Sequence, residues 1–445
     1  MKKRLTLKQS IILASMIFGM FFGAGNLVFP VSMGQQAGAN FIPAAIGFCL
    51  TGAGIPLLGI AAMGISRSEG LFDMCLRVGK PYAYFFTLLL YLSIGPLFAI
   101  PRTATVSFSV GIQPMLPAGS TQLALCVFSA LFFSLVLLFS LRPSGIMTWI
   151  GKLLNPLFLF FLAVLAVTAL LNPMAPASAA EPTGKYIAAS LPQGMLEGYN
   201  TLDAVASLVF GILLVNSVRS LGVEEPRNIS RSTLLSGLLS TALMAAIYAT
   251  LTLLGAQSRS VLGVSPDGGA ALYAIGAHYF GAFGGVLLGC IVTLACLKTA
   301  IGLITSCATA FVEIFPRSLS YRAYATLFCL FSFGVANFGL SRIIALSLPA
   351  LMFLYPLTIT LILLCMFGHL FDYDRRVFIS VTAFTLVPAA LDFLNALPEG
   401  PRALLFGDAI QAVTMKLPLF AIGMGWVLPA CAGLALGLIL RRRSK

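Results

Sequence analysis

Residues 18–30 of the chain read FGMFFGAGNLVFP, and this stretch decides how the rest of the sequence is interpreted. It lies in an apolar run long enough to cross a membrane, yet it places three glycines and an asparagine within eight residues. Glycine and asparagine are poor helix formers, so a helix is weakened here. One interpretation is close packing of a neighbouring helix on the glycines. The other is an interrupted helix, whose free amides could bind an anion and whose free carbonyls could bind a cation.

A second stretch repeats these features. Residues 198–211 read GYNTLDAVASLVFG and carry Asn200, Thr201 and Asp203 inside another apolar run. The segment SLVFG at 207–211 echoes NLVFP at 26–30, at a distance of 181 residues. Two interrupted helices in corresponding positions are typical of secondary transporters built from inverted repeats. In such proteins the binding site lies where the two interruptions meet.

The composition places the whole chain in a membrane. Of its 445 residues, 59% are hydrophobic and 9% are charged, and the mean hydropathy is +0.99. A soluble domain carries about 25% charged residues. A soluble enzyme and a nucleic-acid-binding protein are therefore excluded, despite a net charge of +13. Continuous apolar runs of roughly 20 residues favour membrane-spanning helices over a β-barrel.

These runs predict an all-α polytopic membrane protein with twelve transmembrane helices. The predicted spans are 9–34, 40–64, 81–111, 121–141, 147–172, 194–218, 230–257, 281–312, 321–338, 342–368, 376–397 and 417–440. The two interrupted spans are the first and the sixth. The two copies are offset by five spans. Because this number is odd, the second copy is inverted in the membrane, which predicts a 5+5 inverted repeat. We expect a single membrane domain in which 1–172 is the first five-helix repeat, 194–368 the second, inverted repeat, and 376–440 two peripheral helices.

Basic residues predict the orientation. With twelve spans, 20 of the 27 Lys and Arg residues fall on the side of the two termini and 5 fall on the other side. Positively charged loops face the cytoplasm, so both termini are expected there, and the basic end at Arg441–Arg443 would face anionic membrane lipid. The sequence carries no catalytic motif and no His/Cys metal spacing. We therefore expect neither an enzyme nor a resident cofactor, and no nucleic-acid partner; the oligomeric state stays open.

Polar groups inside the spans are the candidates for function, because burying them in a bilayer is costly. Asp203 either accepts hydrogen bonds from the unwound backbone or takes part in coupling. Arg102 is interpreted as a structural residue that pairs with an acid or extends to the membrane surface. The adjacent hydroxyls of Thr305 and Ser306 either bond to their own helix or complete an oxygen site for a small cation.

These segments resemble the branched-chain amino acid carrier family, the bacterial leucine/isoleucine/valine:cation symporters. The matching segments are 22–30, 34–38, 95–96, 101–106, 198–199, 201–203, 295–297, 299–303 and 337–341. The resemblance implies a leucine-transporter-type fold. It also implies import of leucine, isoleucine and valine with Na⁺, or in some members H⁺, across the bacterial plasma (inner) membrane.

Such a substrate would use the first interruption. The amides of Gly23, Ala24, Gly25 and Asn26 are expected to bind its carboxylate, because glycine lets the backbone come close. We expect Tyr91 and Phe210 to form an apolar wall for the aliphatic side chain, and Ser207 to help hold the polar end.

By similarity to the broader fold, the coupling cation would be held by two sets of groups. One set is formed by the carbonyls of Gly19 and Phe22, and the other by Gly302, Thr305 and Ser306.

Two positions depart from the family pattern and leave the coupling ion open between Na⁺ and H⁺. Ser109 stands where the family usually has Glu, and Lys298 stands where it has an uncharged residue. Lys298 lies four residues before Gly302, on the same helix face. It could substitute for the cation, or it could pair with an acid such as Asp203. The alternatives are an H⁺-coupled or Na⁺-independent carrier of another small solute on the same fold and, less favoured, a membrane-embedded enzyme.

Overall fold

The computed structural model describes residues 5–442 except 69, 118, 142–154, 224, 399–413 and 415–417. The described part is helical and contains no β-strand, which confirms the predicted all-α class. Its first half consists of α1 (Leu7–Phe21), α2 (Ala24–Ala37), α3 (Phe41–Cys49), α4 (Ile55–Ser66), α5 (Leu71–Leu76), α6 (Lys80–Leu92), α7 (Ala99–Gly111), α8 (Thr121–Ser140) and α10 (Asn155–Leu171). Its second half consists of α11 (Ser190–Tyr199), α12 (Asp203–Ser220), α13 (Pro226–Leu262), α14 (Gly268–Ile314), α15 (Tyr321–Ala336), α16 (Leu340–Phe367), α17 (Arg375–Ala396) and α20 (Val427–Arg442).

Several helices begin where a side chain satisfies their first amides. Thr6 accepts a hydrogen bond from the amide of Gln9, and the Gln9 side chain reaches back to Thr6, so α1 begins with a capping box. Asp267 accepts from the amide of Ala270 at the start of α14, and Ser320 accepts from Ala323 at the start of α15. These short polar residues therefore mark the boundaries of long apolar helices.

The surface of the helical body is apolar over wide areas. Among the described residues, seven helical segments are long and apolar enough to cross a membrane by length and composition. Large side chains such as Leu123, Leu131 and Leu346 stand more than half exposed on them. A water-soluble protein would bury such residues, whereas lipid accommodates them. The twelve-span count stays a prediction.

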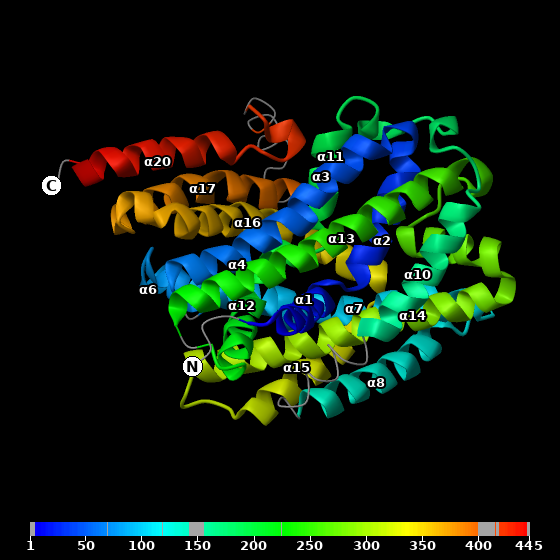
Figure 1. Ribbon diagram of the computed structural model, residues 1–445, viewed down its shortest axis with the longest axis horizontal. Coiled ribbons are helices and arrows are strands. Elements are labelled where there is room, and N and C mark those ends of the chain that lie inside the picture. Colours follow the sequence, from blue (N-terminus) through cyan, green and yellow to red (C-terminus); the bar gives the residue numbers. More distant parts are fainter. Residues whose placement is uncertain are drawn as a thin grey trace.

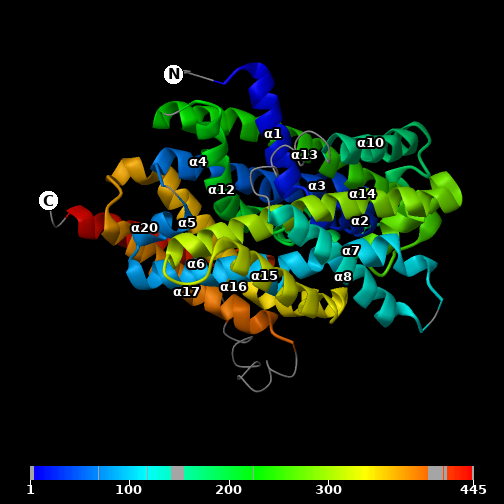
Figure 2. The same ribbon diagram turned by 90° about the horizontal axis from the view of Figure 1, so that it is seen from below.

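The end of α1 and the start of α2 lie in the interior of the body, whereas the start of α1 projects from it at the top of Figure 2 (Figures 1 and 2). Helices α7 and α14 pack against each other and α14 also contacts α2, while α4 and α13 contact each other and border α12. At one edge, α16, α17 and α20 lie side by side, as both views show in orange and red. The interruptions are therefore surrounded by long continuous helices, which fix the ends of the short ones.

The connection expected at 258–280 is largely helical. Helix α14 already begins at Gly268 and bends sharply at Gly281, where φ is +56°, a conformation that favours glycine. The two arms fold onto each other so closely that a Cβ on Gly284 would lie 2.0 Å from the carbonyl oxygen of Gly276. The segment before the bend therefore covers the end of the main helix instead of crossing with it.

Glycines also bring α2 and α13 into backbone contact. A Cβ on Gly34 of α2 would lie 2.1 Å from the carbonyl oxygen of Thr252, and a Cβ on Gly255 of α13 would lie 2.2 Å from that of Val31. Small residues at such interfaces let helices approach until their backbones touch. This contact holds α2, the second half of the first interrupted helix, against the 37-residue helix α13.

We expect the Gly34→Ala variant to be destabilised, because the added methyl group must displace backbone atoms. Overpacking of this kind costs about 1–3 kcal/mol, which should lower the thermal unfolding midpoint of the detergent-solubilised protein. Gly334→Ala in α15 is the matched control, since no atom lies within 4 Å of the added Cβ. It should hold or raise the midpoint, as alanine is the better helix former. Equal midpoints for the two variants would contradict the close contact of α2 with α13.

Candidate functional site

The first interruption separates α1 from α2 at Phe22 and Gly23, as predicted. Phe22 leaves the helix with φ −73° and ψ 93°. The amide of Gly23 donates to Oδ1 of Asn26 at 2.9 Å, and it makes no hydrogen bond to the carbonyl of Gly19, its partner in a continuous helix. The Gly19 carbonyl is thereby freed at the end of α1, which carries the negative end of the helix dipole.

The second interruption separates α11 from α12 over residues 200–202. Leu202 adopts φ +70°, a left-handed conformation that is strained for a residue with a side chain. The hydroxyl of Thr201 donates to the carbonyl of Gly198 at 2.9 Å and accepts from the amide of Asp203 at 3.3 Å. The hydroxyl of Tyr355 donates to the carbonyl of Tyr199. Side chains therefore satisfy backbone groups that the interruption releases.

A hydrogen-bonded group of three side chains, the Asn26–Asp203–Tyr248 cluster, joins the two interruptions. The side-chain amide of Asn26 donates to Oδ2 of Asp203 and to the hydroxyl of Tyr248. The Tyr248 hydroxyl donates to the same Oδ2 at 3.1 Å. All three side chains are buried, with Asn26 1% and Asp203 2% exposed. The cluster ties α2, α12 and α13 together at the point where the helices are broken.

Arg102 of α7 approaches both interruptions. Its Nη2 donates to the carbonyl of Asn200 at 3.0 Å, and its guanidinium lies 5.5 Å from the centre of the Phe29 ring. A Cβ on Gly25 would come within 3.2 Å of the same Nη2. The acid partner expected for this residue is not within ion-pair distance among the described residues; a backbone carbonyl of the second interruption takes that place.

A small cavity lies between the interruptions. It measures about 30 Å³, the room of one or two water molecules. Gly23, Ala24, Gly25 and Asn26 line it on one side, as predicted for a substrate site. The other lining residues are Met20, Phe21, Ile94, Ala99, Arg102, Thr103, Thr201, Leu202, Asp203, Ala206, Phe210, Thr299 and Leu303. The cavity is thus polar along α2, at its two charged residues and at three threonines, and apolar elsewhere.

Of the three predicted side-chain contacts, Phe210 lines the cavity and the other two do not. Ser207 is directed at α4, because its Oγ would lie 1.9 Å from a Cβ on Gly59, and it donates to the carbonyl of Ala204. The buried Tyr91 ring lies 6.5 Å from that of Phe311. The structure therefore brings the α2 residues and Phe210 together and places Ser207 and Tyr91 outside.

The residues predicted for the cation lie on α14 and on the end of α1. A Cβ on Gly302 would lie 3.8 Å from the Met20 side chain, so α14 borders α1 there. Thr305 donates to the carbonyl of Ile301 at 2.8 Å, within its own helix. The hydroxyl of Ser306 is buried and has no hydrogen-bond partner among the described residues. Ser306 and the Gly19 carbonyl are therefore oxygen groups that are open to a ligand.

Lys298 is buried completely beside the end of α1. Its ammonium lies 4.0 Å from the centre of the Phe158 ring on α10 and 5.6 Å from the Phe18 ring on α1. Both distances suit a cation–π interaction, which strengthens where water is excluded. The partner proposed from the sequence, Asp203, is not within ion-pair distance. The Lys298 amine therefore lies next to the last turn of α1.

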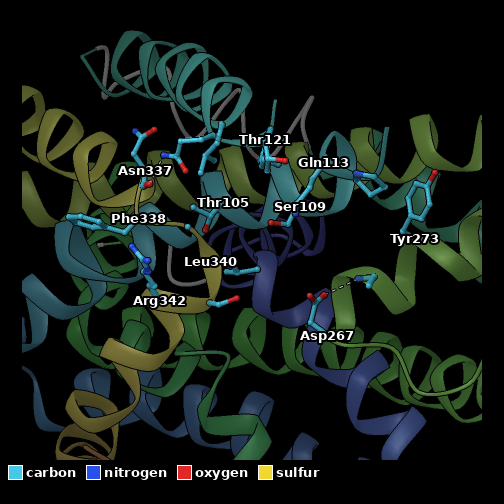
Figure 3. A pocket seen from close by; sticks show the side chains of 17 residues that line it. Thr105, Ser109, Gln113, Thr121, Asp267, Tyr273, Asn337, Phe338, Leu340 and Arg342 are labelled. Carbon is cyan, nitrogen blue, oxygen red and sulfur yellow. Dashed lines mark hydrogen bonds between the residues drawn. The ribbon is translucent and has the colours of Figure 1, made fainter. Parts of the chain in front are cut away.

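A larger cavity of about 870 Å³ adjoins α7 beyond Arg102 (Figure 3). Thr105 and Ser109, three and seven residues after Arg102, line it, so both cavities border the same face of α7. Figure 3 shows Asn337 and Arg342 at one end of this cavity and Tyr273 at the other. None of the residues predicted to bind substrate or cation lines it. Ser109 is directed to this larger space.

Sequence reasoning missed two residues of the small cavity's surroundings. Tyr248 lies in the middle of an apolar helix and has no motif around it, so only the fold reveals its contact with Asp203. The hydroxyl of Thr299 is buried without a hydrogen-bond partner among the described residues, and it would lie 2.9 Å from a Cβ on Gly23. The signal for Thr299 was its place in a matching segment, next to Lys298.

The sequence is similar to known transport proteins over its whole length. The family described as branched-chain amino acid transport protein matches residues 6–444. A branched-chain amino acid permease, BrnQ, from Lactobacillus delbrueckii subsp. lactis is 48% identical over 453 residues, covering 100% of both chains. The permease BraB from Bacillus subtilis (strain 168) is 39% identical and covers 99% of this chain and 97% of its own.

Two solved structures share the fold. MhsT in complex with L-phenylalanine superposes with a TM-score of 0.59 at 15% identity, covering 99% of each chain. Mhp1, a nucleobase-cation-symport-1 family transporter with bromovinylhydantoin bound, gives a TM-score of 0.55 at 15% identity and covers 94% of this chain and 95% of its own. At this identity the likeness concerns the leucine-transporter-type fold alone.

We expect Asn26→Leu to destabilise the protein, because Leu keeps the volume and removes the amide that donates to Asp203 and to Tyr248. A lost hydrogen bond to a charged group costs about 1.5–3 kcal/mol, to be measured as a lower thermal unfolding midpoint in detergent. In an Asp203→Asn background the cost of Asn26→Leu should be smaller, since the acceptor is no longer charged. Tyr248→Phe removes the other donor to Oδ2 and should also lower the midpoint. If the effects of Asn26→Leu and Asp203→Asn simply add, the two residues are not coupled and the cluster has no energetic role.

Proposed function

This chain belongs to the branched-chain amino acid transport protein family, and from that membership we propose that it imports leucine, isoleucine and valine by symport with a cation. Its relatives are named permeases, so the family consists of transporters rather than enzymes. The observation that carries the proposal is the small cavity between two facing helix interruptions, joined by the Asn26–Asp203–Tyr248 cluster. Helix interruptions of this kind hold substrate and ion in secondary transporters.

We propose that the chain crosses the bacterial plasma membrane twelve times, as two inverted five-helix repeats and two peripheral helices. The positions of the two interruptions support the repeat, since each lies a few residues before one of the paired segments NLVFP and SLVFG. The excess of basic residues on one side supports cytoplasmic termini. Lipid is then the partner of the exposed apolar side chains.

The substrate carboxylate would bind at the first turn of α2. The amides of Ala24 and Gly25 stand at a helix N-terminus, where the dipole favours an anion. The aliphatic side chain would contact Phe21, Phe210 and Leu303, which are apolar and line the cavity. Because about 30 Å³ does not hold a leucine, the surrounding helices must separate to admit it. Such a change is expected of a carrier that opens alternately to the two sides.

The coupling cation is proposed to be Na⁺, bound by the carbonyls of Gly19 and Phe22 and by Gly302, Thr305 and Ser306. The freed Gly19 carbonyl and the buried, unpartnered hydroxyl of Ser306 support this assignment. The alternative is that Lys298, or Asp203, takes part in H⁺ coupling. The burial of the Lys298 ammonium beside the end of α1 favours it, since a helix C-terminus attracts positive charge.

We expect the purified chain in proteoliposomes to accumulate labelled leucine when an inward Na⁺ gradient is imposed. Unlabelled isoleucine and valine should compete, and a nucleobase or an aromatic amino acid should not. Dissipating the Na⁺ gradient should abolish accumulation, because a symporter gains its driving force from the ion. If none of the three branched-chain amino acids accumulates or competes, the protein carries another solute on the same fold.

Two variants separate the possible coupling ions. Ser306→Ala should raise the Na⁺ concentration for half-maximal leucine uptake by about tenfold or more, the effect of losing one ligand to a charged group. Ser332→Ala is the matched control, because Ser332 is another buried serine whose hydroxyl lacks a partner, on α15. It should leave the Na⁺ dependence unchanged.

The lysine alternative predicts a different result. The unmodified protein would then take up leucine in Na⁺-free buffer with a pH dependence that Lys298→Val removes. Strict Na⁺ dependence, indifferent to pH, would exclude this role of Lys298.

A further inference from the structure

Two opposite charges line the small cavity without pairing with each other. Arg102 is 6% exposed and Asp203 is 2% exposed, yet no nitrogen of one lies within 4.0 Å of an oxygen of the other. Buried charges of opposite sign normally form a hydrogen-bonded pair, because an uncompensated charge in a low dielectric is costly. Their separation across a cavity points to a ligand that completes them.

The arginine has unused donors beside a helix N-terminus. A guanidinium carries five N–H groups, and within the described chain Arg102 places one hydrogen bond, from Nη2 to the carbonyl of Asn200. The same Nη2 lies close to Gly25 in the first turn of α2, a turn that contains no acidic residue. The helix dipole and the guanidinium therefore both favour an anion at this end of the cavity.

The aspartate has one oxygen available. Its Oδ2 accepts from Asn26 and from Tyr248, whereas no hydrogen bond to Oδ1 is found among the described residues. Asn26 directly follows Gly25, so the guanidinium and the carboxylate both approach the first turn of α2. The positive and the negative group thus line the same small cavity.

We propose that Arg102 and Asp203 recognise the two charges of an α-amino acid, Arg102 binding its carboxylate together with the α2 amides and Asp203 binding its ammonium through Oδ1. This inference rests on the proposed function and names its specificity-determining residues. An α-amino acid carries both charges, so it supplies one partner for each of the two groups that line the cavity. A neutral solute would leave both protein charges unpaired, and a lone cation would leave Arg102 without an anion.

Arg102 and Asp203 both bind substrate under this proposal. Arg102 is not a purely structural arginine, because a surface or packing role would not direct a guanidinium at the substrate cavity. Asp203 is positioned by Asn26 and Tyr248, which occupy one oxygen and orient the other. The apolar part of the cavity then contacts the aliphatic side chain of the substrate. The charged part selects for zwitterionic ligands.

The test compares three ligands on the full-length purified protein: leucine, leucinamide, which lacks the carboxylate, and 4-methylpentanoate, which lacks the ammonium. Binding is measured by competition with labelled leucine. In the unmodified protein both analogues should bind far more weakly than leucine. Removing one partner of a buried charge contact costs several kcal/mol, so Arg102→Gln should weaken leucine on the order of a hundredfold. The Arg102→Gln variant should also bind leucine and leucinamide equally well. It should still prefer leucine to 4-methylpentanoate.

Asp203→Asn should show the converse: it should lose the preference for leucine over 4-methylpentanoate and keep that over leucinamide. Arg322→Gln and Asp372→Asn remove the same charges at exposed positions and should change neither preference. Thermal unfolding of each variant reports whether it is folded. Arg102→Lys, which keeps the charge, should retain the preference over leucinamide and serves if Arg102→Gln does not fold.

Three outcomes would overturn the inference: analogues that bind the unmodified protein as tightly as leucine, a folded Arg102→Gln that still discriminates against leucinamide, or an Asp203→Asn that alters only the cation dependence of uptake. The first outcome would show that binding requires no charge contact. The second would show that the α2 amides bind the carboxylate without Arg102. The third would assign Asp203 to the cation. If the unmodified protein binds none of the three branched-chain amino acids, the proposed function itself is wrong.

Discussion

Everything in this structure depends on satisfying the backbone polar groups that two broken helices expose inside an apolar body. In hydrocarbon a free amide or carbonyl costs several kcal/mol, so irregular backbone is tolerated only where protein or a cavity supplies partners. Here the side chains of Asn26, Thr201 and Tyr355 each bond to a released backbone group. The groups left over, at the start of α2 and the end of α1, are those that a substrate or a cation can use.

The surrounding helices make this arrangement possible by close contact. Gly34 and Gly255 bring α2 and α13 to backbone distance, and Tyr248 of α13 thereby reaches the Asn26–Asp203–Tyr248 cluster. The strained Leu202 is held between helices that are continuous on all sides. Rigid neighbours thus maintain a local geometry that a short segment would not keep by itself.

The charged side chains differ in how they are held. Among the described residues the ion pair Arg441–Asp372 lies at the surface, whereas the buried Arg102 donates to a backbone carbonyl and the buried Asp203 accepts from a side-chain amide. These neutral partners hold the two charges in place without cancelling them. The buried ammonium of Lys298 lies over the Phe158 ring, near the end of α1.

The sequence by itself determined the class, the family and both helix interruptions. Apolar composition leaves no alternative to helices in a membrane, and glycine or asparagine in mid-helix marks a break locally, so these features need no tertiary information. It also pointed to the α2 residues and Phe210, which line the small cavity, while their role in binding stays a prediction. Only the tertiary structure decided which side chains lie at the cavity and which contact Asp203. Ser207 is directed at Gly59, Tyr91 lies outside the cavity, and Tyr248 reaches Asp203 from a helix that carries no motif. The physical reason is that the direction of a side chain on an apolar helix depends on helix packing, which a chain of uniformly apolar residues does not encode in its periodicity.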